Sequence, residues 1–286
     1  MKILVTGANG QVGSELRFLS LIQNQHEWVF TDLQELDLSD LKNLEINISK
    51  IAPSLIINCA AYTSVDKAES ENELANILNF KAVDLISKWS SNNRKKLIHI
   101  STDYVFDGNS ETPMREDAVT SPINIYGSSK LKGENVCLKN DLNSIIIRTS
   151  WVYSSFGNNF VKIMRNLMKK RDSLSVVNDQ VGSPTYAADL AETILTIVNH
   201  KKWNAGVYHY SNEGKISWFD FANDIKYFSN SKTQINGIST EEYPTVAKRP
   251  KYSMLDKTKI KETYNIKVPD YKDSLKKCIK ILQNEA

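Results

Sequence analysis

The amino-acid sequence predicts an α/β protein with a doubly wound, mostly parallel sheet and a smaller region after it. Three features predict this fold class. Short runs rich in Ile, Leu and Val alternate with longer helical segments, as in successive β-α-β units. Most of these runs show no polar alternation, which is expected for strands that helices cover on both faces. A glycine-rich turn follows the first run directly, where such sheets bind ligands.

The predicted elements follow one another regularly up to about residue 182, after which turn residues and aromatic residues become frequent. We therefore expect residues 1–182 to form mainly the sheet domain and residues 183–286 mainly the smaller region, with several chain crossings between them allowed. The predicted strands are Lys2–Thr6, Trp28–Thr31, Leu55–Asn58, Leu97–Ser101, Ser144–Arg148 and Ser173–Val177. The predicted helices are Glu71–Ser90, Ile125–Leu138, Trp218–Phe228 and Tyr271–Gln283.

The composition excludes several classes of protein. Of 286 residues 41% are hydrophobic, and 36 basic against 33 acidic residues give a net charge of +3, too small an excess for a nucleic-acid-binding surface. Three widely spaced cysteines without a CxxC pair predict neither a disulfide framework nor a metal site. No apolar stretch approaches the ~18 residues that span a bilayer, and a strand follows Met1 at once. We expect a cytoplasmic protein without membrane contact.

The segment TGANGQVG, directly after the first strand, carries three glycines at GxxGxxG spacing: Gly7, Gly10 and Gly13. They can supply a tight turn, a close approach of backbone to a pyrophosphate, and close packing of helix on strand. The helix N-terminus then offers N–H groups to the phosphates. Glycines alone also fit a plain turn, but this position between strand and helix predicts an NAD(P)-binding Rossmann domain. The predicted loop also includes Asn9, Gln11 and Val12.

The end of the second strand bears on the choice of coenzyme. Asp32 lies there, about 20 residues after the loop, where an acidic side chain bonds the 2′-hydroxyl of the adenosine ribose. This favours NADH. Arg17 on the preceding helix could still accept a 2′-phosphate, so the sequence predicts NADH or NADPH with a preference for NADH.

The pattern YGSSK places Tyr126 and Lys130 four residues apart in a predicted helix, so their side chains share one face. Ketone reduction needs a proton at oxygen as hydride arrives at carbon. A free tyrosine has a pKa of ~10, and we expect the Lys130 ammonium to lower the pKa of Tyr126. The same ammonium can reach the nicotinamide ribose. The bare pattern also fits two exposed helix residues, but the glycine loop favours catalysis.

The segment HISTDYVFDG places Thr102 at the carboxyl edge of the sheet, where its hydroxyl can bond a substrate carbonyl beside Tyr126. A threonine that only caps the turn is the alternative. The three segments together resemble the extended short-chain dehydrogenase/reductases, and within them the dTDP-4-dehydrorhamnose reductase family. The resemblance covers nearly the whole chain. The matching stretches are Asn58–Glu69, Ser101–Gly108, Ser121–Glu134, Arg148–Ser154, Gly157–Met164, Val176–Ala191 and Arg249–Asp256.

The resemblance implies a catalytic set of Thr102, Tyr126 and Lys130, with hydride passing from NAD(P)H to the 4-keto carbon of dTDP-4-dehydro-6-deoxy-L-mannose to give dTDP-L-rhamnose. It implies that Ala60, Ala61 and Tyr62 line the coenzyme cleft. It implies substrate-side positions for Asp103, Tyr104 and Trp151, although Trp151 also fits a buried core aromatic, and a diphosphate contact for Arg249, whose guanidinium suits phosphate oxygens.

Two other functions remain open. Reductases of other nucleotide-linked 4-keto sugars, such as a UDP-linked 2-acetamido-6-deoxyhexulose, share these markers. The NADP-binding regulatory subunit of methionine adenosyltransferase resembles the same family without acting as a reductase. Dehydratases place an Asp-Glu pair after the threonine, and Asp103-Tyr104 stands here instead. A nucleotide-sugar substrate is expected, the oligomeric state is open with a homodimer as one arrangement, and Glu15 and Glu192 are expected to be ordinary helix-surface residues.

Overall fold

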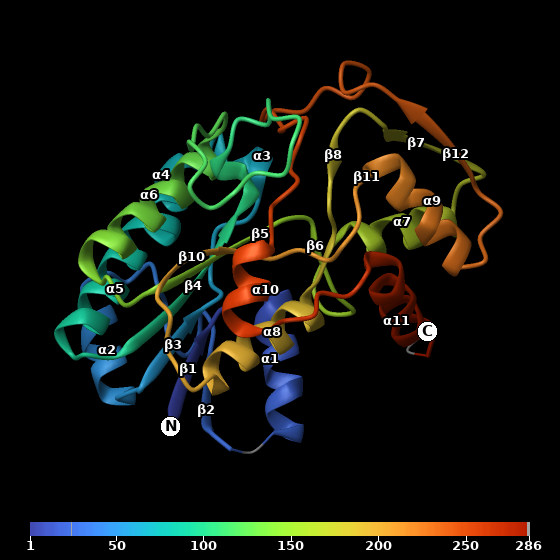
Figure 1. Ribbon diagram of the computed structural model, residues 1–286. Coiled ribbons are helices and arrows are strands. Elements are labelled where there is room, and N and C mark those ends of the chain that lie inside the picture. The colour runs from blue at the N-terminus through green and yellow to red at the C-terminus, as the bar shows by residue number, and fades with distance from the viewer. Residues whose placement is uncertain (24, 285–286) are drawn as a thin grey trace.

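The computed structural model describes residues 1–23 and 25–284, which form a larger and a smaller lobe (Figure 1). The larger lobe contains a six-stranded sheet in the order β10-β5-β4-β3-β1-β2, with every neighbouring pair parallel. Its strands are β1 (Lys2–Thr6), β2 (Glu27–Thr31), β3 (Leu55–Asn58), β4 (Lys96–Thr102), β5 (Ile145–Thr149) and β10 (Gly206–His209). The predicted fold class is confirmed.

The strand order reverses beside β1. The chain first moves outward from β1 to β2 and then returns to the other side of β1 to form β3. In open α/β sheets a ligand-binding crevice opens at the carboxyl ends of the two strands that flank such a reversal. The fold therefore places the glycine-rich turn, which follows β1, at the edge of that crevice.

Helices cover both faces of the sheet. On one face pack α1 (Gln11–Ile22), α8 (Ala187–Asn199) and α10 (Thr258–Tyr264), and on the other α2 (Leu44–Ile51), α5 (Ala82–Asn92) and α6 (Ile125–Asn140). Short turns of helix precede α5: α3 (Val65–Ala68), α4 (Asn72–Asn76) and the π-helical η1 (Ile77–Lys81). Across the described residues, no helix combines the length and apolar character needed to cross a bilayer.

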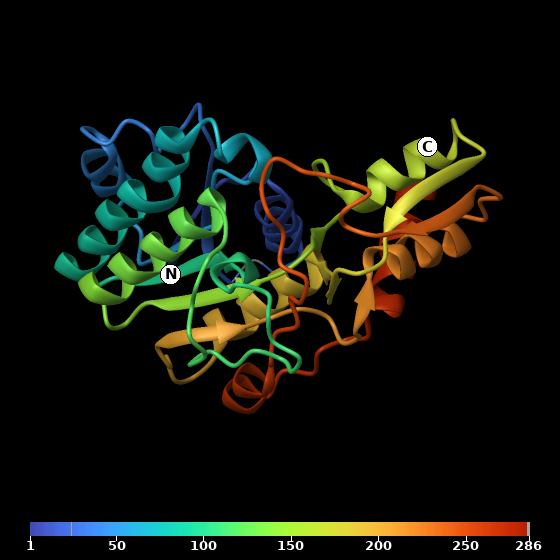
Figure 2. The ribbon, with the colours of Figure 1, turned by 90° about the horizontal axis from the view of Figure 1, so that it is seen from above.

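The smaller lobe has its own apolar core. Figure 2 shows its helices and its β7–β12 pair standing apart from the main sheet. Its helices are α7 (Phe160–Met168), α9 (Trp218–Phe228) and α11 (Tyr271–Asn284). Its strands are β7 (Ser173–Val177) and β12 (Gln234–Ile238), and short strand pairs at the junction of the lobes are β6 (Val152–Tyr153) with β9 (Thr185–Tyr186) and β8 (Val181–Gly182) with β11 (Ile216–Ser217).

The structure differs from the sequence prediction at one strand of the main sheet. The predicted strand Ser173–Val177 forms, but it pairs with β12 in the smaller lobe, and its exposed side chains alternate with buried ones. The edge position beside β5 is taken by β10, a four-residue strand that the sequence did not reveal. Because each apolar core draws residues from both sides of position 182, we propose a division by core, with the chain crossing between the lobes several times.

Candidate active site

The glycine loop packs tightly against the end of β3. Gly7 has a φ of +65°, and a Cβ atom there would lie 2.6 Å from the backbone N of Ala60. A Cβ atom on Gly13 would collide with the carbonyl oxygen of Gly7. The α1 helix begins after Gly10, which has no side chain to cap it. The first-turn N–H groups of α1 therefore face the crevice between β1 and β3, where phosphate groups can accept them.

Asp32 ties the end of β2 to this loop. One of its carboxylate oxygens accepts the backbone N–H of Asn9 at 2.8 Å, and the other accepts that of Leu33 at 2.8 Å. The guanidinium of Arg17 lies 5.2 Å from the centre of the Phe30 ring, on the exposed side of α1. The structure thus brings Asp32 to the glycine loop, and it stacks Arg17 on Phe30.

Val12 and Gln11 hold the start of α1 in place. Val12 is buried in the sheet core. The Gln11 side-chain amide donates to the carbonyl of Val152 at 3.3 Å, which links the loop to the junction of the lobes. Glu15, one turn later, is only 5% exposed and accepts a hydrogen bond from Ser154 at 2.5 Å. The prediction of an ordinary surface position is therefore wrong for Glu15, whereas Glu192 is exposed as predicted.

The segment Ala60–Tyr62 follows β3 and is held by a residue that sequence reasoning missed. The amide of Asn79 accepts the backbone N–H of Tyr62 at 2.8 Å and donates to its carbonyl at 3.0 Å. The same amide donates to the Ser129 hydroxyl on α6 at 2.9 Å. Asn79 lies in the π-helical turn η1, and such turns often mark functional sites. No sequence pattern predicts that π-helical turn.

Thr102 and Tyr126 meet at the carboxyl edge of the sheet. Thr102 ends β4, and Asn124 caps α6 by accepting the backbone N–H of Gly127 at 2.8 Å. A side chain at Gly127 would collide with the carbonyl oxygen of Tyr104, so glycine lets α6 start close to β4. The Thr102 hydroxyl donates to Asp103 Oδ1 at 3.0 Å, and it lies close enough to the Tyr126 hydroxyl to influence the pKa of that group. Two of the three predicted catalytic residues are therefore neighbours.

Burial sets the protonation of Tyr126. It raises the pKa of Tyr126 above its usual value of 10.0, and the neighbouring Thr102 hydroxyl offsets only part of this effect. The expected lowering of that pKa by Lys130 is wrong for this structure, because burial dominates and Lys130 Nζ contacts other groups. A protonated Tyr126 at neutral pH suits a residue that must donate a proton.

Lys130 lies one helical turn after Tyr126 and is 2% exposed. Its Nζ donates to the carbonyl oxygen of Ile100 at 2.6 Å and lies 3.4 Å from Nε2 of His99. Burial lowers the pKa of Lys130 to about 8, although the nearby Glu134 carboxylate raises it. Lys130 is thus a desolvated ammonium that needs little free energy to lose its proton.

A second polar group, also missed from the sequence, supports α6 beside Lys130. Glu134 accepts the Arg148 guanidinium at 2.7 Å and also bonds the Ser101 hydroxyl. Arg148 lies 3.4 Å from Nε2 of His209, and burial lowers the pKa of His209 to about 3. These side chains come from β4, β5, β10 and α6. The signal was present in the sequence, since each of these strands carries a polar residue near its end.

Two of the predicted substrate-side residues, Tyr104 and Asp103, lie beside Tyr126. Tyr104 packs edge-on against Tyr126 with 5.4 Å between ring centres. Asp103 is 2% exposed, and burial raises its pKa to about 6. Arg249 belongs to the segment that returns from β12 to the larger lobe, drawn in orange-red in Figures 1 and 2. Its guanidinium donates to Asp66 at 2.7 Å, and its positive charge opposes the rise in the pKa of Tyr104 that burial causes.

Trp151 lies two residues after β5, where the chain leaves the main sheet. Its backbone has a φ of +48°, an uncommon conformation for a residue with a side chain. Its indole stacks on Trp218 with ring centres 3.6 Å apart, and a Cβ atom on Gly182 would lie 2.7 Å from it. Strained backbone of this kind is often found at functional sites. Trp151 is half-buried at the junction of the lobes.

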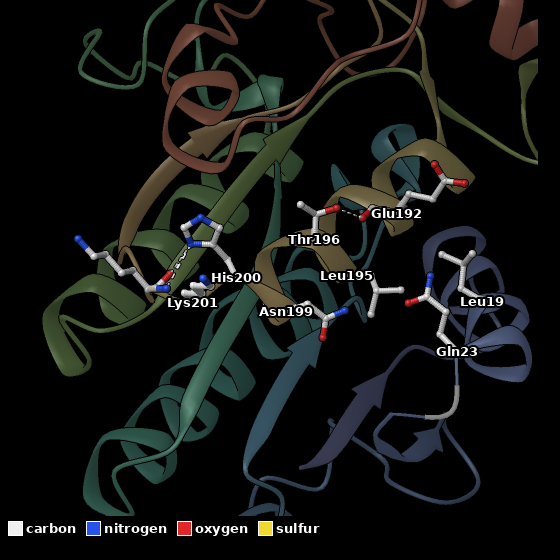
Figure 3. A pocket seen from close by; sticks show the side chains of 9 residues that line it. Leu19, Gln23, Glu192, Leu195, Thr196, Asn199, His200 and Lys201 are labelled. Carbon is white, nitrogen blue, oxygen red and sulfur yellow. Dashed lines mark hydrogen bonds between the residues drawn. The ribbon is translucent and has the colours of Figure 1, made fainter.

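A surface hollow elsewhere does not belong to this site. Figure 3 shows it between α1 and α8, with Leu19, Gln23, Leu195 and Asn199 among its lining residues. It reaches the C-terminal ends of these helices, which lie at the amino ends of the parallel strands. The Tyr126 region lies at the opposite edge of the sheet, so the two features are separate.

Comparison with known proteins is consistent with the geometry. The family model described as RmlD substrate binding domain matches residues 1–284. A dTDP-4-dehydrorhamnose reductase of Aggregatibacter actinomycetemcomitans is 39% identical, covering 96% of this chain and 97% of the relative. The crystal structure of a dTDP-4-dehydrorhamnose reductase of Clostridium acetobutylicum superimposes with a TM-score of 0.94 at 39% identity, covering 99% and 100% of the two chains. That of Bacillus anthracis, in complex with NADP, gives 0.93 at 38% identity, covering 97% and 98%.

Proposed function

Because this chain belongs to the RmlD substrate binding domain family, we propose that it is an NAD(P)H-dependent dTDP-4-dehydrorhamnose reductase. It reduces the 4-keto group of dTDP-4-dehydro-6-deoxy-L-mannose and releases dTDP-L-rhamnose. The observation that carries this function is that Thr102 and Tyr126 are neighbours at the carboxyl edge of the sheet, one helical turn from the buried Lys130 and next to the glycine loop.

The coenzyme fits the crevice at the end of β1. Gly7 and Gly10 leave room for a pyrophosphate at the N-terminus of α1, and Asp32 presents a carboxylate beside the loop. When bound, NAD(P)H supplies the hydride. A bound adenosine ribose would find the Asp32 carboxylate at its 2′-hydroxyl, so we expect this chain to prefer NADH over NADPH.

The chain's own residues supply the proton and hold the ketone. Thr102 and Tyr126 donate hydrogen bonds to the keto oxygen, and Tyr126 gives its proton to that oxygen as negative charge develops. The raised pKa of Tyr126 keeps this proton in place until then. Lys130 restores the proton of the phenolate that remains. Asp103, Tyr104 and Trp151 line the sugar site. Arg249 contributes to the diphosphate site, where its guanidinium releases Asp66 and donates to phosphate oxygens instead.

A panel of substrates tests this function. Purified protein is supplied with NADH or NADPH and with dTDP-4-dehydrorhamnose made in situ, a UDP-linked 2-acetamido-6-deoxyhexulose, or no sugar, and coenzyme oxidation is followed by absorbance. We expect rapid oxidation with the dTDP sugar alone. Oxidation with the UDP sugar alone would move the function to another 4-keto sugar. Coenzyme binding without oxidation of any sugar would favour the non-catalytic role.

A further inference from the structure

A row of buried polar side chains spans three neighbouring strands of the sheet and ends at Lys130. Thr6 on β1, Asn58 on β3 and His99 on β4 are register neighbours on adjacent parallel strands. Their side chains are 0–1% exposed and face α6. The Thr6 hydroxyl lies 2.6 Å from Asn58 Oδ1, Asn58 Nδ2 lies 3.0 Å from His99 Nδ1, and His99 Nε2 lies 3.4 Å from Lys130 Nζ. The function proposed above uses only the last residue of this row.

The row has a direction, which fixes where the imidazole carries its proton. The Thr6 hydroxyl donates to Oδ1 of Asn58, so the Asn58 NH₂ group faces His99. An NH₂ group only donates, so Nδ1 of His99 must accept. Burial and the nearby Lys130 keep the pKa of His99 well below its usual range, so the ring stays neutral. A neutral ring that accepts at Nδ1 carries its proton on Nε2, the atom that faces Lys130.

Among the described residues no carboxylate forms an ion pair with Lys130, although the charge of Glu134 raises its pKa. Glu134, one turn along α6, is held by Arg148 through two guanidinium nitrogens. The thiols of Cys59, after β3, and Cys137, on α6, have pKa values raised by burial to about 12 and are uncharged at neutral pH. The Ile100 carbonyl at 2.6 Å is a neutral acceptor. His99 is therefore the neighbour of Nζ that can either donate or accept a hydrogen bond, depending on which ring nitrogen carries its proton.

We propose that His99 is a positioning residue, held by Asn58 and Thr6 with its proton on Nε2, and that this N–H favours release of the proton from Lys130. An N–H at Nε2 cannot accept from an ammonium, but it can donate to a neutral amine. Loss of a proton from Lys130 thus completes a chain of donors that runs from Thr6 through Asn58 and His99 to Nζ. This inference rests on the proposed role of Lys130, which restores the proton of Tyr126.

The tautomer of His99 can be read directly and needs no substrate. In ¹⁵N spectra of the uniformly labelled protein, nitrogen shifts distinguish a protonated from an unprotonated ring nitrogen. The chain has four histidines, and the His99→Gln variant identifies the signals of His99. We expect Nδ1 unprotonated and Nε2 protonated around neutral pH. The reverse tautomer, or a charged ring, would overturn the proposal even if the protein proves to be the proposed reductase.

Asn58→Asp tests the consequence for Lys130. A carboxylate only accepts, so it draws the His99 proton to Nδ1 and turns Nε2 into an acceptor for the Lys130 ammonium. We expect the pKa of Lys130, followed by the ¹³Cε shift and assigned with Lys130→Arg, to rise by about one unit or more. With the proposed substrate, we expect kcat to fall at high pH as Lys130 loses its proton. In Asn58→Asp the pH at which kcat falls rises together with the pKa of Lys130. An unchanged pKa in a folded Asn58→Asp protein would contradict the proposal.

A smaller change guards against misfolding of that variant. Thr6→Val removes the hydroxyl that holds the Asn58 amide in one orientation and conserves the side-chain shape. Asn58 then fixes the tautomer of His99 less firmly, so we expect a rise in the pKa of Lys130 that is smaller than in Asn58→Asp. Thr31→Val is the matched control, because Thr31 is the register neighbour of Thr6 on β2 and its hydroxyl bonds only the backbone carbonyl of Val5. Equal pKa values of Lys130 in the two valine variants would show that the row does not act on Lys130.

Discussion

The two faces of the central sheet differ at its carboxyl edge. On the face under α1 and α8, Val5, Ile57 and Ile147 pack in one apolar core. The face under α5 and α6 starts apolar, with Leu4, Ile56 and Leu97. It then becomes polar where the strands end, with the Thr6 row and the Arg148–Glu134 pair.

This difference shows that the alternation of side chains along a strand can serve both packing and chemistry. Side chains of a strand point to opposite faces in turn, so one polar residue near a strand's end changes one face and leaves the other apolar. Polar groups brought so far from water must be bonded to one another. The buried polar groups beside α6 are therefore expected to control activity, and the apolar core residues under α1 and α8 to control stability alone.

The largest expected effect is on catalysis. Tyr126→Phe removes the proton donor of the polar face, and we expect turnover to fall by about 100- to 10,000-fold while coenzyme binding persists. Tyr208→Phe is the control, because Tyr208 packs in the apolar core and its hydroxyl bonds the carbonyl of Asn204. Steady-state kinetics of both variants make the test. Turnover of Tyr126→Phe within a few-fold of the unmodified protein would remove Tyr126 from the proton-donor role.

The second effect is on stability. Arg148→Met leaves the Glu134 carboxylate buried without its partner, and we expect the free energy of unfolding to fall by about 3–5 kcal/mol. Ile147→Val, the neighbour that faces the apolar core, should cost only about 0.5–1.5 kcal/mol. Urea denaturation measures both. Glu134→Gln is then added to Arg148→Met. If the double variant regains much of the lost free energy of unfolding, the unpaired carboxylate is the cause, and no gain would contradict this.

The third effect depends on pH. Burial raises the pKa of Asp103 from 3.8 to about 6, so the folded state holds this proton more tightly than the unfolded state. Asp103 therefore costs stability above pH 6, and this cost disappears as the pH falls below 3.8. We expect Asp103→Asn to raise the free energy of unfolding at pH 8 by about 1–3 kcal/mol and to lower activity. The exposed Asp117→Asn should change neither, and a gain independent of pH would contradict the assignment.

The smallest effect concerns the coenzyme. Asp32→Ala removes the carboxylate beside the glycine loop, and we expect kcat/KM for NADH to fall about tenfold relative to that for NADPH, equal to about 1.4 kcal/mol. Asp37→Ala changes a carboxylate that bonds the nearby Ser39 and serves as the control. The ratio of kcat/KM values for the two coenzymes is the measurement. If that ratio is the same in both variants, Asp32 does not select the coenzyme.

Much of the larger lobe could be predicted because its signals are local. Five of the six strands, the glycine loop and the α6 pattern stand out in short stretches of sequence. The strand β10 was missed because four residues after a turn give too little pattern, and β7 was assigned to the wrong sheet because pairing depends on distant residues. The buried polar groups were missed for the same reason. His99 and Arg148 gain their partners only when four strands and α6 come together.

Transfer of deuterium from labelled NADH to the sugar tests the proposed reduction. Protein, dTDP-4-dehydrorhamnose made in situ and NADH deuterated at C4 of the nicotinamide are incubated, and the sugar product is analysed by mass spectrometry and NMR. We expect dTDP-L-rhamnose with one deuterium at C4 of the sugar, and almost none from Tyr126→Phe. Folded protein that binds the coenzyme and yields no labelled dTDP-L-rhamnose would contradict the proposed reduction.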